Sequence, residues 1–209
     1  MLSSCDNVLD IRILHFPGHF AVPGITPTPG VKHASIMCAL SHPFSRGSVH
    51  ISSADPLAPP AIDPNYFSNP ADLDILARGA DFCLRLWETE ELGGSVKKRV
   101  LPGDLPGRDN DEVRLEKIKE YVKEYVGPVF HPVGTAAMMK REEGGVVDPE
   151  LKVYGTSNVR VADVSILPLV IIFVCYLPCS VLNFACSQEL SIHILSAAYA
   201  IAEKVISFD

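Results

Sequence analysis

The residues best suited to chemistry lie in three short segments of the second half of the chain. They read VFHPVGTAAM from Val129, GVVDPELKVYG from Gly145 and NVRVADVSILP from Asn158. The imidazole of His131, in the first segment, can exchange a proton near neutral pH. A single histidine before a proline is more often a packed loop residue. The prediction therefore depends on the order and spacing of all three segments.

This series resembles the carboxyl-terminal signature of the glucose-methanol-choline (GMC) oxidoreductase family. In that signature HPVGT, V-D-P-x-L-x-V-x-G and a hydrophobic strand ending in D-x-S-x-x-P follow one another. Upstream, SHPFSRG around His42 and SADPLAPPAIDPNY, residues 53–66, are similar to the start of the same region. The resemblance covers roughly residues 37–209, and its specificity comes from several independent motifs that recur in order.

The resemblance implies a reaction and the residues that carry it. Members of the family transfer a hydride from an alcohol carbon to N5 of FAD while a histidine takes the hydroxyl proton. His131 corresponds to that base, and His193 to a second residue near the substrate hydroxyl. Asp163, Val164 and Ile194 are expected against the flavin, partly through backbone groups. The implied partners are FAD, a small alcohol or sugar, and oxygen or a quinone as electron acceptor.

The position of His193 departs from the family pattern. It follows His131 by 62 positions, whereas the family places its second residue four dozen positions downstream or fewer. Residues 170–188 are uncharged, contain three cysteines and have no place in the pattern, and without them the spacing becomes 43. Because a valine codon begins with GT and one glutamine codon is CAG, we interpret 170–188 as a retained intron. The mature transcript would then join Leu169 directly to Glu189.

Two other interpretations of this apolar run stay open. Residues 164–188 carry no charge and are long enough to cross a bilayer about 30 Å thick. Pro168, Pro178 and several polar residues make a poor spanning helix, and no basic cluster flanks the run, so a membrane segment is disfavoured. The third interpretation is a buried apolar insertion beside the flavin site, which would displace the helix that carries His193.

Composition excludes several other classes of function. The net charge of -7 and the absence of a dense basic cluster argue against a nucleic-acid partner. The six cysteines form no CxxC pair, and the remaining histidines are not spaced as a ligand set, so no metal site is expected. Residues 1–10 lack the pattern of a signal peptide. Secretion of a longer parent protein is compatible with the family, but the location is not predicted.

The sequence also predicts several of the strands and helices that must position these residues. Residues 34–52 suggest two strands around a turn at 42–47, forming a hairpin, and the five prolines of 55–70 require an extended run. A helix is predicted from Ala71, capped by Asn69 with Pro70 at its first position. A second is predicted over 111–126, with a buried stripe of Val113, Leu115, Ile118, Tyr121, Val122 and Tyr125.

The expected fold class is α+β. Residues 1–36 form a loop-rich leading segment and 37–209 the GMC carboxyl-terminal region, with 170–188 as an anomalous insertion. The resemblance implies a substrate-binding domain with an antiparallel or mixed sheet and helices. A strand at 158–163 and the last helix would belong to a Rossmann-like FAD domain, whose G-x-G-x-x-G turn is absent from these 209 residues. Two functions stay open: part of an FAD-dependent alcohol or sugar oxidoreductase, or a catalytically inactive, truncated relative that does not bind flavin.

Overall fold

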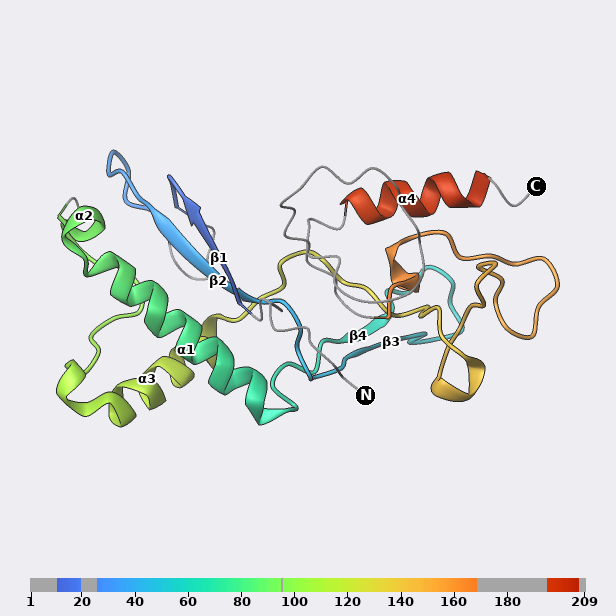
Figure 1. Ribbon diagram of the computed structural model, residues 1–209, viewed down its shortest axis with the longest axis horizontal. Helices are drawn as coiled ribbons and strands as arrows, with labels where there is room; N and C mark the ends of the chain where they lie inside the picture. Colours follow the sequence, from blue (N-terminus) through green and yellow to red (C-terminus); the bar gives the residue numbers. More distant parts are fainter. Residues whose placement is uncertain (1–10, 20–25, 95, 169–194, 207–209) are drawn as a thin grey trace, which may run out of the picture. The chain divides into compact units, whose positions relative to one another are not determined.

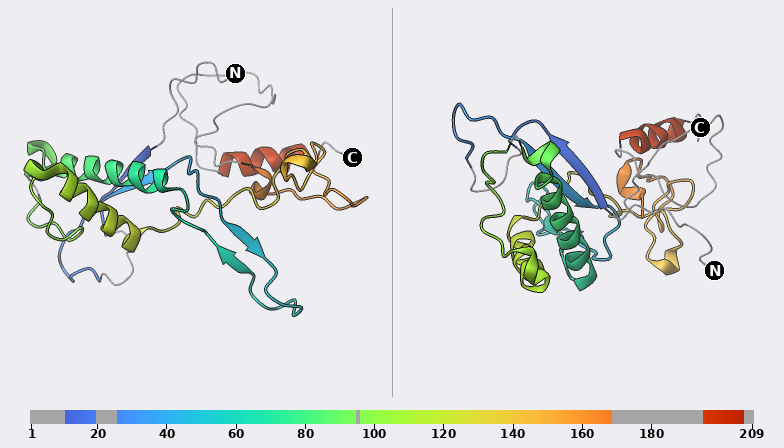
Figure 2. Two further views of the ribbon diagram at one scale, coloured as in Figure 1. Left: turned by 90° about the horizontal axis from the view of Figure 1, so that it is seen from below. Right: turned by 60° about the vertical axis from the view of Figure 1, so that its left-hand side comes forward.

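The computed structural model describes residues 11–19, 26–94, 96–168 and 195–206. These residues fold as a mixture of helices and two small antiparallel sheets, which is an α+β arrangement. They divide into two compact units. The helical unit comprises the described residues of 11–47 and 64–127, and the motif unit comprises those of 48–63 and 128–206. Figures 1 and 2 show the elements of each.

A two-stranded sheet and a long helix form the centre of the helical unit. Strands β1 (Ile11–Phe16) and β2 (Ser35–Leu40) pair antiparallel, with Ile13 opposite Cys38. Helix α1 (Pro70–Trp87) packs against both strands, most extensively against β2. The predicted start of α1 is confirmed, because Asn69 is its N-cap and accepts a hydrogen bond from the Ala71 N–H at 3.0 Å.

The first turn of α1 also holds the loop that follows β2. The Asp72 side chain is almost fully buried and accepts hydrogen bonds from the backbone N–H groups of Phe44 (2.8 Å) and Ser45 (2.7 Å) and from the Ser45 hydroxyl. Burial opposes the charged form, but these hydrogen bonds and nearby Arg46 outweigh it, so the pKa of Asp72 lies below its ordinary value. Asp72 therefore joins the start of α1 to the loop that follows β2.

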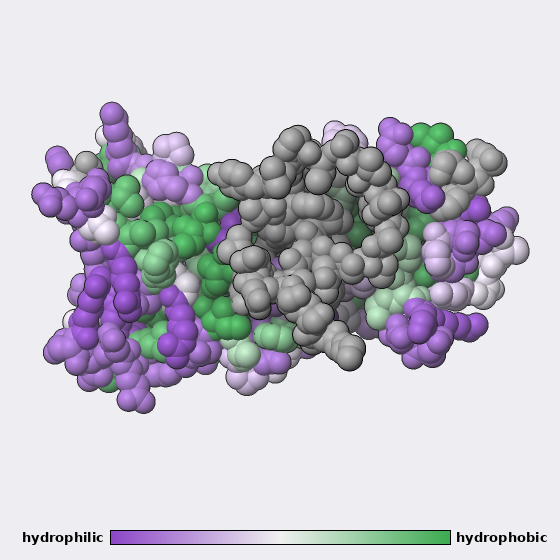
Figure 3. Space-filling model, viewed as in Figure 1, coloured by the Kyte–Doolittle hydropathy of each residue, from purple (hydrophilic) through white to green (hydrophobic). Residues whose placement is uncertain are grey.

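Helices α1 and α3 (Asp111–Tyr125) pack together through a core of Ala77, Leu84, Ile118 and Val122. Along the chain, α2 (Glu90–Gly93) and the short 3-10 helix η1 (Arg108–Asn110) come between α1 and α3. Asn110 caps α3 by accepting from the Val113 N–H. The outer face of α3 is charged, with pairs such as Lys117–Glu120, and is purple in Figure 3.

One part of the predicted α3 stripe is wrong. Val113 is 46% exposed, whereas the neighbouring Arg114 is only 5% exposed and occupies the buried face. Its Nε donates to Oδ1 of Asp81 on α1 at 2.8 Å, and Asp81 also accepts from Nη2 of Arg85 at 2.6 Å. Burial works against the Asp81 charge, but these two arginines hold the pKa of Asp81 below its ordinary value. A buried ion pair, which apolar periodicity does not detect, sets the register of α3 on α1.

The motif unit contains short elements joined by long loops. Strands β3 (Ser48–His50) and β4 (Ala61–Asp63) pair antiparallel, with Val49 opposite Ile62. The 3-10 helices η2 (Arg141–Glu143) and η3 (Val164–Ile166) and helix α4 (Leu195–Ile206) follow. The core of this unit is apolar and consists of Val147, Leu151, Ile166, Leu167 and Ile201.

Two predictions about strands are wrong. The strands within 34–52 do not form one hairpin, because β2 pairs with β1 and β3 with β4, while Asp72 binds the backbone of the loop between them. Residues 158–163 form no strand. The Val153 N–H donates to the Val159 carbonyl, and the Val161 N–H donates to the Leu151 carbonyl. These two bonds make one isolated bridge, between Lys152 and Arg160, and no sheet ladder.

Several predictions fall outside the described residues. The apolar run 170–188, His193 and Ile194 belong to this group. The proposed boundary between residues 36 and 37 and the assignment of α4 to a flavin domain stay predictions. In the part of the chain that the structure describes, no helix is both long and apolar enough to cross a membrane.

Candidate active site

His131 lies on a tightly turned loop of the motif unit. The loop follows α3 and carries two residues with left-handed backbone conformation, Phe130 (φ 58°) and Gly134 (φ 86°), on either side of His131. Such a conformation is unusual for phenylalanine, and strained residues of this kind gather at functional sites. Phe130 is 76% exposed, whereas His131 is half-buried and its Nδ1 atom is shielded from solvent. Nδ1 is therefore not the ring nitrogen that a substrate would reach.

Backbone hydrogen bonds hold this loop against the segment that contains Asp163 and Val164. The Ala136 N–H donates to the Ser165 carbonyl at 3.0 Å, and the Met138 N–H donates to the Ile166 carbonyl at 2.8 Å. A Cβ atom at Gly134 would lie 3.3 Å from the Leu167 carbonyl oxygen, so the glycine permits this close approach. Two motifs about thirty residues apart in sequence are thus joined side by side.

Asp163 and Val164 stabilise the start of η3. The Asp163 side chain is exposed and accepts a hydrogen bond from the Ser165 N–H at 2.8 Å, which caps η3. Val164 is half-buried and packs against the apolar core of the motif unit. A contact from Val164 to a cofactor would therefore come through its backbone.

The V-D-P segment has a structural part in this unit. Asp148 Oδ1 accepts from the N–H groups of Glu150 and Lys152, both at 2.9 Å, and so shapes the turn after Val147. Val147 is fully buried and bridges to both Met138 and Val153. The Tyr154 hydroxyl donates to the Met139 carbonyl at 3.1 Å. These bonds connect the second motif to the first, and the carboxylate of Asp148 serves the turn.

Helix α4 completes the support of the site. Its buried Ile201, with Ala197 and Val205, packs on the core that includes Ile166 of η3. The described part of α4 begins at Leu195, immediately after Ile194. His193 and Ile194 lie outside the described residues, so their approach to His131 stays a prediction. The packing of α4 holds the chain from Leu195 onward against the core of the motif unit.

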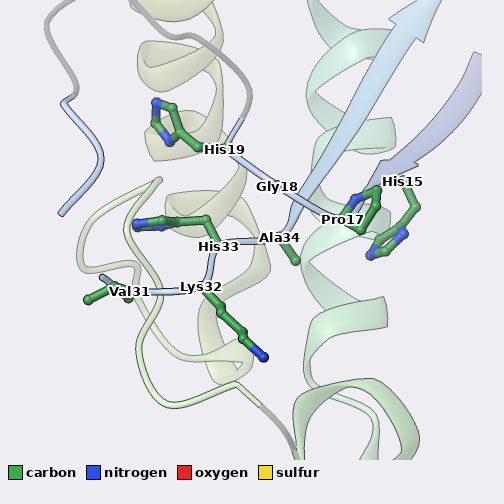
Figure 4. A pocket seen from close by; sticks show the side chains of 8 residues that line it. All are labelled: His15, Pro17, Gly18, His19, Val31, Lys32, His33 and Ala34. Atoms are coloured by element: carbon green, nitrogen blue, oxygen red, sulfur yellow. The ribbon is translucent and has the colours of Figure 1, made fainter. Parts of the chain in front are cut away.

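Two cavities of the structure are lined by segments other than the His131 loop. One of about 460 Å³ lies in the helical unit and is lined by residues including His15, His19 and His33 (Figure 4). Another, of about 560 Å³, lies along the loop of 49–60. His131 lines neither of them. Across the described ranges, no three His, Cys, Asp or Glu side chains gather as a metal-binding group.

Sequence reasoning found part of this arrangement and missed the rest. It selected His131, Asp163 and Val164, and the structure places all three in the same unit, on two segments that hydrogen-bond to one another. It missed the left-handed Phe130, because nothing in that residue type signals a positive φ. The glycine of HPVGT was an available signal for the turn at Gly134.

Known proteins resemble the chain over these same segments. The GMC oxidoreductase family model matches residues 43–181. A dehydrogenase of Monascus ruber, citC, is 34% identical over 205 residues, which cover 93% of this chain and 28% of that protein. Among solved structures, a fungal aryl-alcohol oxidase has 33% identity and a TM-score of 0.63 over 81% of this chain and 24% of its own. A formate oxidase of Aspergillus oryzae, studied for FAD modification, has 30% identity and a TM-score of 0.65. The match covers 86% of this chain and 27% of the formate oxidase.

The chain therefore spans about a quarter of the length of these proteins. The matched region contains the HPVGT loop, the V-D-P turn and η3, which are the segments that build the site. The family model matches well over half of the chain. The chain belongs to the GMC oxidoreductase family.

Proposed function

We propose that this chain is the carboxyl-terminal part of an FAD-dependent oxidoreductase that oxidises the CH–OH group of a primary alcohol, an aryl alcohol or a sugar. The observation that supports this most directly is the hydrogen-bonded pair of segments that carry His131 and Asp163. The structural relatives named as aryl-alcohol oxidase and formate oxidase agree with a small oxidisable substrate.

The described residues fit one end of FAD. The exposed Asp163 and the backbone of Val164 stand beside the His131 loop and could face the flavin ring and ribityl chain, with Ile194 as a further candidate. None of the 14 glycines forms a G-x-G, so the pyrophosphate end must be held by residues outside these 209. When bound, FAD supplies the acceptor for the hydride.

His131 would take the proton of the substrate hydroxyl at Nε2. Its Nδ1 is buried, and the left-handed residues Phe130 and Gly134 shape the loop that carries the ring. His193 would hold the same hydroxyl from the other side. His131 lines neither of the two cavities of about 460 and 560 Å³, and the remainder of the longer protein would close over it and exclude water.

A second function is an inactive relative that keeps this fold and binds no flavin. The observation that favours it is the missing pyrophosphate turn in the 209 residues. The two proposals are separated by the full-length transcript, read from upstream of Met1 through the junction of Leu169 and Glu189. An upstream G-x-G-x-x-G turn and a spliced junction support the oxidoreductase. A complete transcript that encodes only the present residues supports the inactive relative.

The role of His131 is tested in the longer flavoprotein with His131→Asn. Without the base, we expect anaerobic flavin reduction by an alcohol substrate to slow by roughly 10²- to 10⁴-fold, with the FAD content unchanged. His50→Asn, in exposed β3, is the matched control and should keep the wild-type rate. Equal rates for the two variants would remove His131 from the mechanism.

A further inference from the structure

Two cysteines of the helical unit face one another across elements that are far apart in sequence. Cys38 lies in β2 and is half-buried, and Cys83 lies in α1 and is 6% exposed. Strand β2 and helix α1 pack against each other along their length. The two thiols interact closely enough for each to shift the pKa of the other. The other four cysteines of the chain lie outside the described residues.

A glycine on α1 makes this close approach possible. Gly79 precedes Cys83 by one helical turn and therefore lies on the same face of α1. A Cβ atom at position 79 would lie 2.6 Å from Sγ of Cys38 and 2.5 Å from Cδ1 of Ile11. Any larger residue would require the Ile11 and Cys38 side chains to move away from the helix. The absence of a side chain at Gly79 thus creates the space in which the Cys38 sulfur reaches Cys83.

We propose that Cys38 and Cys83 form a disulfide when the folded chain meets a peroxide, and that this bond joins β2 covalently to α1. The Cys83 thiolate attacks one oxygen of hydrogen peroxide, the O–O bond breaks, and the leaving hydroxide takes a proton to become water. The Cys38 thiol then attacks the sulfur of the Cys83 sulfenic acid, the S–O bond breaks, and the thiol proton leaves with the hydroxyl group as the second water. In sum, two thiols and one peroxide give one disulfide and two waters.

The electrostatics of the pair indicate which sulfur reacts first. The interaction with Cys38 lowers the pKa of the Cys83 thiol, although burial opposes this shift. The same interaction, followed by burial, raises the pKa of Cys38. Thiolate is the reactive form of cysteine, so Cys83 is the first nucleophile and Cys38 the resolving thiol. The reaction needs no flavin and stands apart from the proposed oxidoreductase function.

Peptide mapping of the full chain tests this directly. The reduced protein is treated with hydrogen peroxide, its remaining thiols are alkylated, and it is digested with trypsin without reduction. Cleavage after Lys32, Arg46, Arg78 and Arg85 places the two cysteines in peptides 33–46 and 79–85. We expect these peptides linked, with a mass two hydrogens below their sum, and separated again by a reductant.

Variants separate a specific bond from general oxidation. Cys38→Ser should abolish the linked peptide, whereas Cys179→Ser should leave its yield unchanged. As a second readout, peroxide should raise the thermal midpoint followed by Trp87 fluorescence in the wild type and in Cys179→Ser, and a reductant should reverse it. The same midpoint should not rise in Cys38→Ser. Peptides 33–46 and 79–85 recovered only unlinked, or linked only to other cysteines, would overturn the proposal.

Discussion

The helical unit and the motif unit stabilise their folds in different ways. In the helical unit, side chains at helical spacing on α1 and α3 meet in a core, and a buried ion pair between Asp81 and Arg114 fixes their register. In the motif unit, the core side chains come from short segments that backbone hydrogen bonds connect, such as Ala136 to Ser165. Two residues with positive φ lie at the candidate base.

This difference has a functional consequence. A helix pair fixes a surface through many replaceable contacts, so single side chains can change with limited effect on position. A loop network fixes one histidine through a few specific backbone bonds, and a small displacement there moves the imidazole. The motif unit therefore has the precise but fragile construction expected of a site, whereas the helical unit has that of a scaffold.

The largest effect is expected from breaking the buried ion pair of the helical unit. Arg114→Leu leaves Asp81 with only Arg85, whose side chain is half exposed, and removes the donor to the Pro106 carbonyl. We expect a loss of about 3 kcal/mol in the free energy of unfolding, because the buried Asp81 carboxylate loses its buried partner and keeps only the half-exposed Arg85. Urea denaturation followed by Trp87 fluorescence measures it, since Trp87 is the single tryptophan and lies in α1.

The matched control is an exposed ion pair on α1, the helix that carries Asp81. Arg78 pairs with Asp74 at 2.8 Å in solvent, and Arg78→Leu should change the unfolding midpoint little. Equal losses for Arg114→Leu and Arg78→Leu would contradict the view that burial of the pair sets the register of α3.

The second effect concerns the loop that Asp72 holds, and it depends on pH. Asp72→Asn keeps the shape but turns one acceptor into a donor that faces backbone N–H groups, so we expect a loss of about 2 kcal/mol at neutral pH. The folded-state pKa of Asp72 is lowered, so its stabilisation is full above the unfolded value of about 3.9 and disappears as the pH falls through the folded value.

Unfolding free energies of wild type and Asp72→Asn across acidic pH provide the measurement. The difference between them should be constant above the unfolded pKa and shrink below it. Ser45→Ala, which removes the hydroxyl donor and keeps the carboxylate, should cost less than Asp72→Asn above the unfolded pKa. A gap between wild type and Asp72→Asn that widens on acidification would show that the carboxylate is not the stabilising form.

Periodicity and capping residues predicted much of the helical unit, since α1, its cap at Asn69 and the core positions Ile118 and Val122 all follow local rules. Those rules missed Arg114, because a buried charge contradicts apolar patterning and its partner is 33 positions away. In the motif unit, spacing and resemblance selected His131, but the bonds that position it join backbone atoms, which residue types do not encode. The prediction of a strand at 158–163 was wrong for the same reason, because residue types do not show which backbone groups bond to one another.

The third prediction tests the backbone construction of the motif unit. Gly134→Ala places a Cβ on a residue with φ 86° and 3.3 Å from the Leu167 carbonyl, so we expect a loss of about 1.5 kcal/mol. Hydrogen–deuterium exchange of a peptide that contains Ala136 and Met138 should speed up, because both amides bond to the η3 segment. Exchange in α1 should not change.

Gly144→Ala separates the two causes. Gly144 has nearly the same φ, 89°, but a Cβ there meets nothing within 4 Å. Gly144→Ala should therefore cause the conformational strain without a contact like that of residue 134 with the Leu167 carbonyl. Hydrogen–deuterium exchange at Ala136 and Met138 should stay closer to that of the wild type. If Gly144→Ala opened these amides as much as Gly134→Ala, the approach to Leu167 would not be what holds the His131 loop.

The smallest effect is expected at the cap of α1, where the helical unit should show its tolerance. Asn69→Ala removes the acceptor for the Ala71 N–H, and we expect a loss of about 1 kcal/mol in the free energy of unfolding. Asn69→Ser retains an acceptor and should recover most of it. Because Ala77 and Leu84 anchor α1 on α3, exchange should quicken in the first turn of α1 and stay slow beyond it. Rapid exchange along the whole of α1 in Asn69→Ala would mean that this helix depends on its terminus as the His131 loop depends on its backbone bonds, and the contrast between the two units would fail.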